Sequence, residues 1–506
     1  MEKVMNVDIL MICEGTYPYI RGGVSQWIHT VITNLSDFEF GIIFLGGYKE
    51  QYDSYAYELP KNVKAVFEYF LFEKLQKSKP EKVDFSERSY RVLESLHKWF
   101  REKKVFPWEA KKLDFYFKEI TEKQFLYGYK SWKYIEKKYL ENCPDHSFTD
   151  YFWNVRNMHA PIWRVAHAAK TEINPKVIHS PSTGYAGFLG AIINYDRGIP
   201  FIIHEHGIYT RERKIDILNV NWLEDKRPSL VKSITDIDYF KKMWINFFEA
   251  LGRFEYESAD KIISLFDDAR NIQIQYGADP TKTQIIPNGI DINRFISCRR
   301  KKENIPKIVA LIGRVVPIKD VKTFIKAIKI ASAKLPDIKG WIVGPEDEDP
   351  DYAKECKDLV SVLGLENHIE FLGFKNVEEV LPEVGLVSLT SISEGMPLSV
   401  LEAFASGLPV VATNVGACRQ LIYGGLNEED IRLGKAGEIA PVGRADILGN
   451  LYVRFLTDSS LWKETSTTAI KRVEKFYTLE RFIDEYKNLF KGYLNGRDRG
   501  RTKKYS

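Results

Sequence analysis

Apolar and polar residues alternate in two different ways at the start of the chain. The segment VDILMIC (7–13) is apolar apart from Asp8, which is typical of a buried strand, and FGIIFLG (40–46) repeats that pattern. Between them, VSQWIHTVITNL (24–35) places its apolar residues at the i, i+3, i+4, i+7 spacing of an amphipathic helix. A strand, a glycine-bearing loop, a helix and a second strand form the opening of a doubly wound parallel sheet.

The alternation of strands and helices stops near residue 70 and resumes after residue 160. Residues 70–160 are dense in Lys, Glu and aromatic residues and poor in Gly, which predicts a helical insertion. Its Trp and Tyr residues suit either a packed core or a stacking platform, and we expect packing. Beyond it, strands are expected at 176–180, 199–207, 259–266 and 283–289, with helices from the glycine-rich segment 182–193 and over 225–258.

A second series of strands and amphipathic helices follows a polar, turn-rich linker at 287–306. Its strands are expected at 307–315, 338–345, 368–374, 385–391 and 409–413. We therefore expect an α/β protein with two Rossmann-like domains, 1–290 and 291–475, facing across a cleft. Residues 476–506 are expected to form a C-terminal helix that crosses back to the N-terminal domain, followed by a basic tail.

Composition excludes several classes of protein. The balance of 73 basic and 69 acidic residues, a net charge of +4, argues against nucleic acid as a partner. Five cysteines without C-x-x-C spacing predict reduced, buried thiols in a cytoplasmic chain. No apolar run reaches the ~20 residues of a membrane-spanning helix, and the first residues predict a strand rather than a secretory signal. The tail NGRDRGRTKKYS (495–506) is either a frayed end or a contact for an acidic surface.

Two glutamates with seven residues between them flank a predicted helix start. Glu394 follows the strand at 385–391, Pro397 suits the first helical turn, and Glu402 falls well inside the helix. The free N–H groups of residues 396–399 would form an anion site aided by the helix dipole. This layout suits a nucleotide sugar, with one acid on sugar hydroxyls and the other on the ribose. The alternative is that Glu394 only caps the helix and Glu402 is a solvated charge.

Basic residues and histidines follow other strands. Arg314 and Lys319 in GRVVPIKD (313–320) could bind a diphosphate or be ordinary surface charges. His204 and His206 share one face of a strand end, where an exposed His206 could contact a sugar. A core histidine bonded to the backbone is the alternative, and a zinc site lacks a third ligand at convincing spacing.

Two adjacent glycines, Gly22 and Gly23, precede the first helix. A bare backbone there could approach a pyrophosphate. The pair does not form the G-x-G-x-x-G pattern, so the sequence gives only weak support for a dinucleotide site.

Three of these segments together resemble the retaining glycosyltransferases of family GT4, which have the GT-B fold. They are GRVVPIKD, EGMPLSVLEAFASGLPVVATNVG (394–416) and IPNGID (286–291). More narrowly, ICEGTYPYIRGGVSQWIHTVI (12–32), HEHGIYTRER (204–213) and the long insertion resemble the glycosyltransferase of the Pel exopolysaccharide system, the PelF type. One departure is Ala417, where relatives often have a second glycine.

The resemblance implies a role for each candidate residue. Arg314 and Lys319 match the diphosphate-binding pair, Glu394 the acid on the donor sugar and Glu402 the acid on the ribose. Gly23, next to Gly22, matches the glycine near the pyrophosphate, His206 the active-site histidine and Phe374 the base contact. The donor cradle matches Gly395, Met396, Pro397, Leu398 and Ser399. The resemblance thus makes His206, Glu394, Arg314 and Lys319 the expected catalytic residues.

The family also implies a reaction. It is the retaining transfer of a hexosyl or N-acetylhexosaminyl unit from a UDP-sugar to a growing exopolysaccharide, with the leaving diphosphate taking the acceptor's proton. No metal or other cofactor is expected, and domain closure would bring His206 and Gly23 to the donor. Partner proteins are expected to recruit this cytoplasmic chain to an inner-membrane polysaccharide synthesis complex. The alternatives are a nucleotide-sugar epimerase and a non-catalytic scaffold that binds a UDP-sugar.

Overall fold

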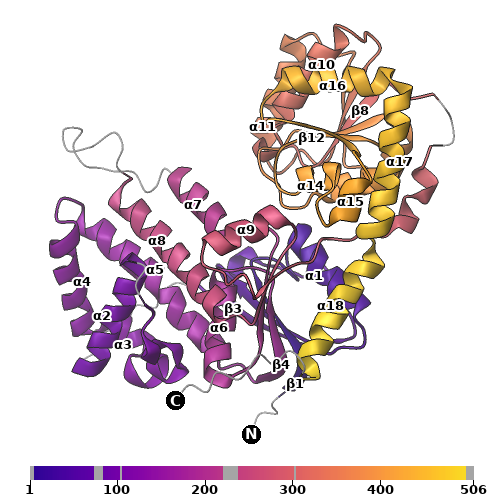
Figure 1. Ribbon diagram of the computed structural model, residues 1–506. Coiled ribbons are helices and arrows are strands. Elements are labelled where there is room, and N and C mark those ends of the chain that lie inside the picture. The colour runs from indigo at the N-terminus through magenta and orange to yellow at the C-terminus, as the bar shows by residue number, and fades with distance from the viewer. Residues whose placement is uncertain (1–4, 73–83, 103–104, 220–236, 301–303, 497–506) are drawn as a thin grey trace. The chain divides into compact units, whose positions relative to one another are not determined.

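The computed structural model describes residues 5–72, 84–102, 105–219, 237–300 and 304–496 (Figure 1). The chain divides into two compact units. The first consists of Met1–Ile263, Asn271–Gln284 and Tyr486–Ser506, and the second of Ser264–Arg270 and Ile285–Glu485. Each unit contains a parallel sheet with helices between successive strands, which confirms the predicted pair of Rossmann-like domains.

Seven strands form the sheet of the first unit. In sheet order they are β3 (Val63–Phe70), β2 (Phe40–Gly46), β1 (Met5–Glu14), β4 (Ile173–Ser180), β5 (Phe201–Glu205), β6 (Lys261–Ser264) and β7 (Thr283–Ile285). The interior strand β2 is buried at every position, as its continuous apolar run predicts. The order reverses between β1 and β4, and in such sheets ligands bind beyond the carboxyl ends of the strands at this switch point.

The helices of the first unit include the expected helical insertion. They are α1 (Gly23–Asn34), α2 (Glu87–Glu102), α3 (Glu122–Tyr127), α4 (Tyr129–Asn142), α5 (Phe148–Ala168), α6 (Tyr185–Arg197), α7 (Tyr209–Asn219), α8 (Tyr239–Ser258) and α9 (Asp267–Gln275). Helices α2 to α5 lie between β3 and β4, where α5 packs on α6 and α2 on α8. Fully buried Trp163 on α5 belongs to one hydrophobic core with the sheet residues, so most of the insertion's aromatics pack as expected.

Six strands form the sheet of the second unit. In sheet order they are β10 (Ile369–Gly373), β9 (Lys339–Val343), β8 (Ile308–Ile312), β11 (Leu386–Leu389), β12 (Val410–Thr413) and β13 (Gly437–Ala440). All of its neighbouring strands pair in parallel. The strand order reverses between β8 and β11, so the loops after these two strands flank the switch point.

Helices connect these strands and continue to the end of the described chain. They are α10 (Val321–Ser332), α11 (Pro350–Val362), α12 (Val377–Val380), α13 (Leu398–Ala405), α14 (Cys418–Tyr423), α15 (Glu428–Arg432), α16 (Ala445–Thr457), α17 (Ser459–Phe476) and α18 (Leu479–Leu494). Helix α18 begins in the second unit, and from Tyr486 onward it belongs to the first. There Tyr486 is buried and Lys487 pairs with Asp37 at 2.7 Å.

Two strands and some boundaries differ from the sequence prediction. Strands β3 and β13, which the prediction lacked, each lie at one edge of their sheet, and β3 is only partly buried. Edge strands need no continuous apolar run, because one side of each has no neighbouring strand to bury it. The helix predicted over 225–258 is observed from Tyr239, residues 225–236 of it lying outside the described ranges, as do residues 497–506 of the basic tail.

The cysteines are buried and unpaired, as predicted. Burial raises the pKa of the Cys418 thiol to about 12, so this group is a neutral thiol at neutral pH. Within the described ranges, no helix combines the length and the apolar character needed to cross a membrane.

Candidate functional site

A lysine and a glutamate meet between the two loops that flank the switch point of the second sheet. Lys319 ends the turn after β8, and its Nζ lies 2.5 Å from Oε1 of Glu394 in the loop after β11. The hydroxyl of Ser391 donates to the same oxygen at 2.5 Å. Glu394 therefore does not cap α13, which has no side-chain cap, and that alternative is wrong.

Arg314 takes a different partner from Lys319. Its Nη1 lies 2.5 and 2.6 Å from the two carboxylate oxygens of Glu348, and both side chains are about half exposed. A surface pair of this kind is weak and readily exchanged for another anion. The structure thus places Arg314 in the same loop as Lys319 without joining it to Glu394, and its role in diphosphate binding stays a prediction.

The start of α13 carries free backbone donors. The helix begins at Leu398, so Pro397 occupies the N-cap position, one residue earlier than predicted. No side chain caps this end and no acid lies in its first turn, so the first amides, including that of Ser399, keep their capacity to bind an anion. Met396 and Pro397 are buried, whereas Gly395, Leu398 and Ser399 are partly accessible.

A third loop, between β12 and α14, contacts the backbone of the Glu394 loop. The amide of Ala417 donates to the carbonyl of Gly395 at 2.8 Å. Gly416 has φ +51°, and a Cβ at this position would lie 2.3 Å from the carbonyl oxygens of Glu394 and Gly395. Only glycine fits this close approach. The sequence analysis noted the departure at Ala417 but did not single out Gly416, whose importance depends on a contact between two distant loops.

Glu402 is more buried than a solvated charge. Burial raises the pKa of its carboxyl to about 7, while nearby Arg294 lowers it and Glu378 raises it. Arg294 and Glu378 are themselves bonded to each other. Glu402 is therefore divided between its neutral and ionised forms near neutral pH, which rules out the alternative of an ordinary solvated acid.

Phe374 stands directly after β10 and is 78% exposed. The preceding Gly373 has φ +62°, a left-handed turn that ends the strand. An exposed ring at a strand end could stack on a base, but the described residues show only that the ring is accessible. Its role stays a prediction.

Gly22 and Gly23 lie in open space at the start of α1. A Cβ at either position would meet no atom within 4 Å, and Gly22 is extended, with φ 171°. The local fold therefore does not require glycine at these positions. A hollow of about 460 Å³ adjoins this turn. Its lining consists of Arg21, Gly22, Gln26, His29, Ala56 and Tyr57.

His206 lies just beyond β5 and is partly buried rather than exposed as predicted. Its ring meets the Trp27 ring edge-on at 5.1 Å and lies 4.4 Å from the ring of His204. Burial lowers the pKa of His206 to about 3, which leaves a neutral imidazole at neutral pH. His204 is fully buried, and its Nδ1 lies 3.1 Å from the hydroxyl of Tyr486, so its partner is a side chain and not the backbone.

Glu205 anchors the strand end from the opposite face of the sheet, where the alternation of a strand places it. It accepts hydrogen bonds from Thr183, Tyr256 and Gln273 at 2.9, 2.5 and 2.9 Å. These bonds fix the backbone from which His206 projects. No role for Glu205 was predicted from the sequence. Among the described residues, no group of three His, Cys, Asp or Glu side chains could hold a metal ion.

The arrangement in the second unit suits a phosphorylated ligand that also carries hydroxyl groups. Lys319 supplies a cation, and α13 supplies backbone donors. The carboxylates of Glu394 and Glu402 can accept hydrogen bonds from hydroxyl groups. This is the set of groups that a nucleoside diphosphate sugar requires.

Family models cover nearly the whole chain. Residues 7–281 match the domain of unknown function DUF3492, and residues 295–472 match the glycosyl transferases group 1 domain. The first match alone spans more than half of the chain.

Curated relatives are distant. The UDP-Gal:alpha-D-GlcNAc-diphosphoundecaprenol alpha-1,3-galactosyltransferase of Escherichia coli is 26% identical over 327 residues, which is 62% of this chain and 73% of that protein. The D-inositol 3-phosphate glycosyltransferase of Geodermatophilus obscurus is 28% identical over 185 residues, 33% of this chain. The chain spans only 41% of the length of that second relative.

Solved structures share the fold over almost the full length. HepE of Anabaena, in complex with UDP and glucose, has a TM-score of 0.56 at 17% identity and covers 96% of this chain and 99% of its own. Sucrose-phosphate synthase of Thermosynechococcus elongatus has a TM-score of 0.57 at 15% identity and covers 97% of this chain and 100% of its own. The chain therefore belongs to the DUF3492 family and carries a group 1 (GT4) glycosyltransferase domain, with the two sheets of the GT-B fold.

Proposed function

We propose that this chain transfers a hexosyl or N-acetylhexosaminyl unit from a UDP-sugar, with retention of configuration, to a growing exopolysaccharide. The observation that carries the proposal is the Lys319–Glu394 pair beside the uncapped start of α13. An ion pair at this place keeps a cation and a hydroxyl acceptor ready next to free amides. The diphosphate of a donor can replace Glu394 as the partner of Lys319. The sugar hydroxyls can then donate hydrogen bonds to the Glu394 carboxylate.

The reaction needs the negative charge that grows on the leaving diphosphate to be stabilised. We assign this task to Lys319, Arg314 and the first amides of α13, since fixed donors aimed at developing charge lower the barrier. Glu402 would accept from the ribose, and Phe374 would stack on the base. The leaving diphosphate would take the proton of the acceptor hydroxyl, and no metal is needed in this scheme.

His206 would contact the transferred sugar, and the Gly22–Gly23 backbone would lie near the pyrophosphate. A neutral imidazole donates a hydrogen bond from one ring nitrogen and accepts one at the other, but it adds no positive charge. We therefore assign His206 to orienting the sugar rather than to neutralising the diphosphate. His204, whose Nδ1 faces Tyr486, is less suited to this role.

Two comparisons support the choice of donor, and the resemblance of two segments supports the choice of acceptor. HepE has been solved in complex with UDP-glucose, and the name of the Escherichia coli relative gives UDP-Gal as its donor. Both favour a uridine nucleotide as the donor of this chain. The resemblance of residues 12–32 and 204–213 to the Pel-type enzymes supports a biofilm exopolysaccharide as the acceptor. We propose a cytoplasmic enzyme that partner proteins recruit to an inner-membrane synthesis complex.

A panel of nucleotide sugars tests the function. The purified chain is incubated with each sugar without added metal, and release of the nucleoside diphosphate is measured. We expect release from one UDP-sugar and its loss in Glu394→Gln. Lys319→Ala should slow release by about tenfold to a hundredfold, the effect of one charge-assisted hydrogen bond.

Lys322→Ala is the matched control. Lys322 also makes an ion pair at 2.5 Å, with Glu355, but lies on α10, where the proposal gives it no role. Equal activity of the Lys319 and Lys322 variants would contradict the proposed site. Binding of UDP without release from any sugar in the presence of acceptor would favour a scaffold.

A further inference from the structure

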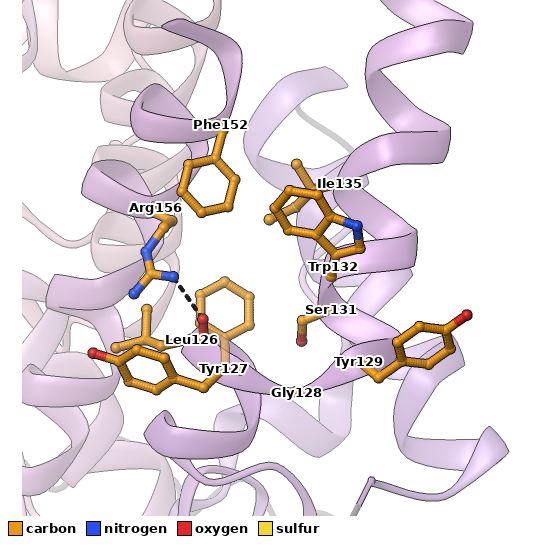
Figure 2. Close-up of a pocket in the computed structure, with 10 residues that line it drawn as sticks. Leu126, Tyr127, Gly128, Tyr129, Ser131, Trp132, Ile135, Phe152 and Arg156 are labelled. Carbon is orange, nitrogen blue, oxygen red and sulfur yellow. Dashed lines mark hydrogen bonds between the residues drawn. The ribbon is translucent and has the colours of Figure 1, made fainter. Parts of the chain in front are cut away.

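A cavity of about 360 Å³ lies inside the helical insertion of the first unit (Figure 2). It is formed by α3, α4 and α5, with Gly128 joining the first two of these helices. None of the strand-end residues discussed above lines it. Its lining consists of Phe125, Leu126, Tyr127, Gly128, Tyr129, Ser131, Trp132, Ile135, Phe152 and Arg156.

Half of the ten residues that line the cavity are aromatic. Figure 2 shows the rings of Trp132 and Phe152 on opposite helices at its upper part, and these ring centroids lie 5.6 Å apart. Trp132 is 44% exposed and Tyr129 is also largely exposed. Cavities of this size with aromatic walls and few polar groups are typical of small-molecule sites.

Arg156 is the one charged residue of the lining. It is 8% exposed, its Nη1 donates to the carbonyl of Leu126 at 2.6 Å, and its Nε has no hydrogen-bond partner. The rings of Tyr127 and Phe152 lie 5.1 and 5.3 Å from the guanidinium carbon. Aromatic faces stabilise a cation but do not neutralise it.

The other buried cations of the described chain all have a carboxylate. Four Lys or Arg residues are buried there: Lys111, Lys138, Arg156 and Arg472. Lys111 pairs with Glu257 at 3.1 Å, Lys138 with Glu141 at 2.6 Å and Arg472 with Asp430 at 2.6 Å.

Arg156 differs from these three. No carboxylate of the described residues lies within ion-pair distance of it. Burial of a charge without a counter-ion is costly, and here burial lowers the pKa of the guanidinium. Arg156 has hydrogen-bond partners in the Leu126 carbonyl and the Tyr127 side chain, but its Nε has none. The lack of a carboxylate partner and the adjoining cavity together indicate an anionic ligand.

We propose that this cavity binds a small aromatic carboxylate, whose ring packs against Trp132 and Phe152 and whose carboxylate pairs with Arg156. The planar guanidinium matches the two oxygens of a carboxylate. An aromatic ring gains edge-to-face or offset contacts with the rings of the wall. Besides Arg156, the polar side-chain groups of the lining are the hydroxyls of Tyr127, Tyr129 and Ser131 and the indole N–H of Trp132, too few to satisfy the backbone of a peptide.

Ligand-observed NMR titration of the full chain tests the proposal with three probes in carboxylate-free buffer. The probes are 3-phenylpropanoate, its neutral analogue 3-phenylpropanamide, and acetate, which has the charge without the ring. We expect saturable binding of 3-phenylpropanoate, with the amide weaker by about tenfold or more, since a charge-assisted pair is lost. Acetate should show no saturable binding. Equal binding of acid and amide, or no saturable binding of the acid, would overturn the proposal.

Variants locate the binding. Trp132→Ala removes a wall from an exposed position, and Arg156→Met removes the charge, so each should weaken 3-phenylpropanoate by about tenfold. Trp108→Ala is the matched control, because Trp108 is also 44% exposed but does not line the cavity. Loss of binding in Trp108→Ala but not in Trp132→Ala would place the ligand elsewhere. If Arg156→Met fails to fold, Trp132→Ala and the three probes still decide the question.

Discussion

At the scale of single residues, the two glutamates of the E-x7-E segment have different surroundings. Glu394 meets Lys319 and the Ser391 hydroxyl, so its charge is compensated. Glu402 is partly desolvated, and the cation nearest to it is already paired with Glu378. A ligand that donates a hydrogen bond to Glu402 would therefore offset the free energy of desolvating its carboxylate.

The raised pKa of Glu402 predicts a pH effect on stability. Its folded-state pKa of about 7 lies above the ordinary glutamate pKa of 4.5, so the fold favours the protonated form. Its contribution to stability is complete below 4.5 and is lost as the pH rises through about 7. Relative to the wild type, Glu402→Gln should gain thermal stability steadily across this interval.

Thermal unfolding midpoints of both proteins, measured across the interval, check this. Glu428→Gln controls for the loss of one negative charge, because the Glu428 side chain is 86% exposed. A difference between wild type and Glu402→Gln that stays constant with pH would contradict the assignment.

Several site residues could be predicted from the sequence, and their partners could not. The spacing of Glu394 and Glu402 around a helix start was visible in a single segment. The partial burial of His206 depends on Trp27 of α1, and the full burial of His204 depends on Tyr486, 282 residues further along the chain. Such contacts arise only when distant elements meet, and no local pattern encodes them.

At the scale of elements, the site of the second unit depends on three loops that follow neighbouring strands. The loop after β8 carries Lys319, the loop after β11 carries Glu394, and the loop after β12 supports the latter through Gly416. The core strands were predicted because their apolar runs are continuous. Two of the four edge strands, β3 and β13, were not, because the fold places weaker demands on the sequence of an edge strand. The other two, β7 and β10, were predicted.

Gly416→Ala tests this support. The Ala Cβ would lie 2.3 Å from two carbonyl oxygens, so the Glu394 loop must move. We expect a loss of about 1–2 kcal/mol from the left-handed backbone alone, further destabilisation from the contact, and weaker UDP binding. Calorimetry of unfolding and of UDP binding measures both effects.

Gly364→Ala separates the two causes. Gly364 also has a positive φ, +62°, but a Cβ there meets no atom within 4 Å. It should show the backbone cost alone and bind UDP like the wild type. Equal UDP affinity in both variants would mean that the β12–α14 loop does not shape the site.

At the scale of the whole molecule, the chain passes from one unit to the other more than once. The sequence analysis placed boundaries at 290 and 475, whereas the long segment of the second unit runs from Ile285 to Glu485. Helix α18 carries the second boundary within it, and no break in its apolar pattern marks that point. Packing against the first unit, not local sequence, decides where the boundary falls.

Separate expression of the two parts tests this division. The fragment Ile285–Glu485 contains β8 to β13 and should unfold cooperatively when followed by circular dichroism. The fragment Met1–Gln284 lacks Tyr486, which covers His179 and His204, so it should expose this surface and bind an apolar dye. Joining residues 486–494 to it through a flexible linker should abolish dye binding. Equal dye binding with and without these residues would contradict the assigned boundary.

The split of α18 has a consequence for how such proteins can be recombined. Apart from the short segment Ser264–Arg270, the second unit is a single stretch of chain inserted into the first. A graft that exchanges the long segment of the second unit between two homologues therefore needs two junctions, near 285 and 485, and must leave the host its own last helical turns. A single crossover after the first sheet would instead pack a foreign C-terminal helix segment against the host's Trp27 and His204. We expect this mismatch to destabilise the hybrid even where the Lys319–Glu394 pair is intact.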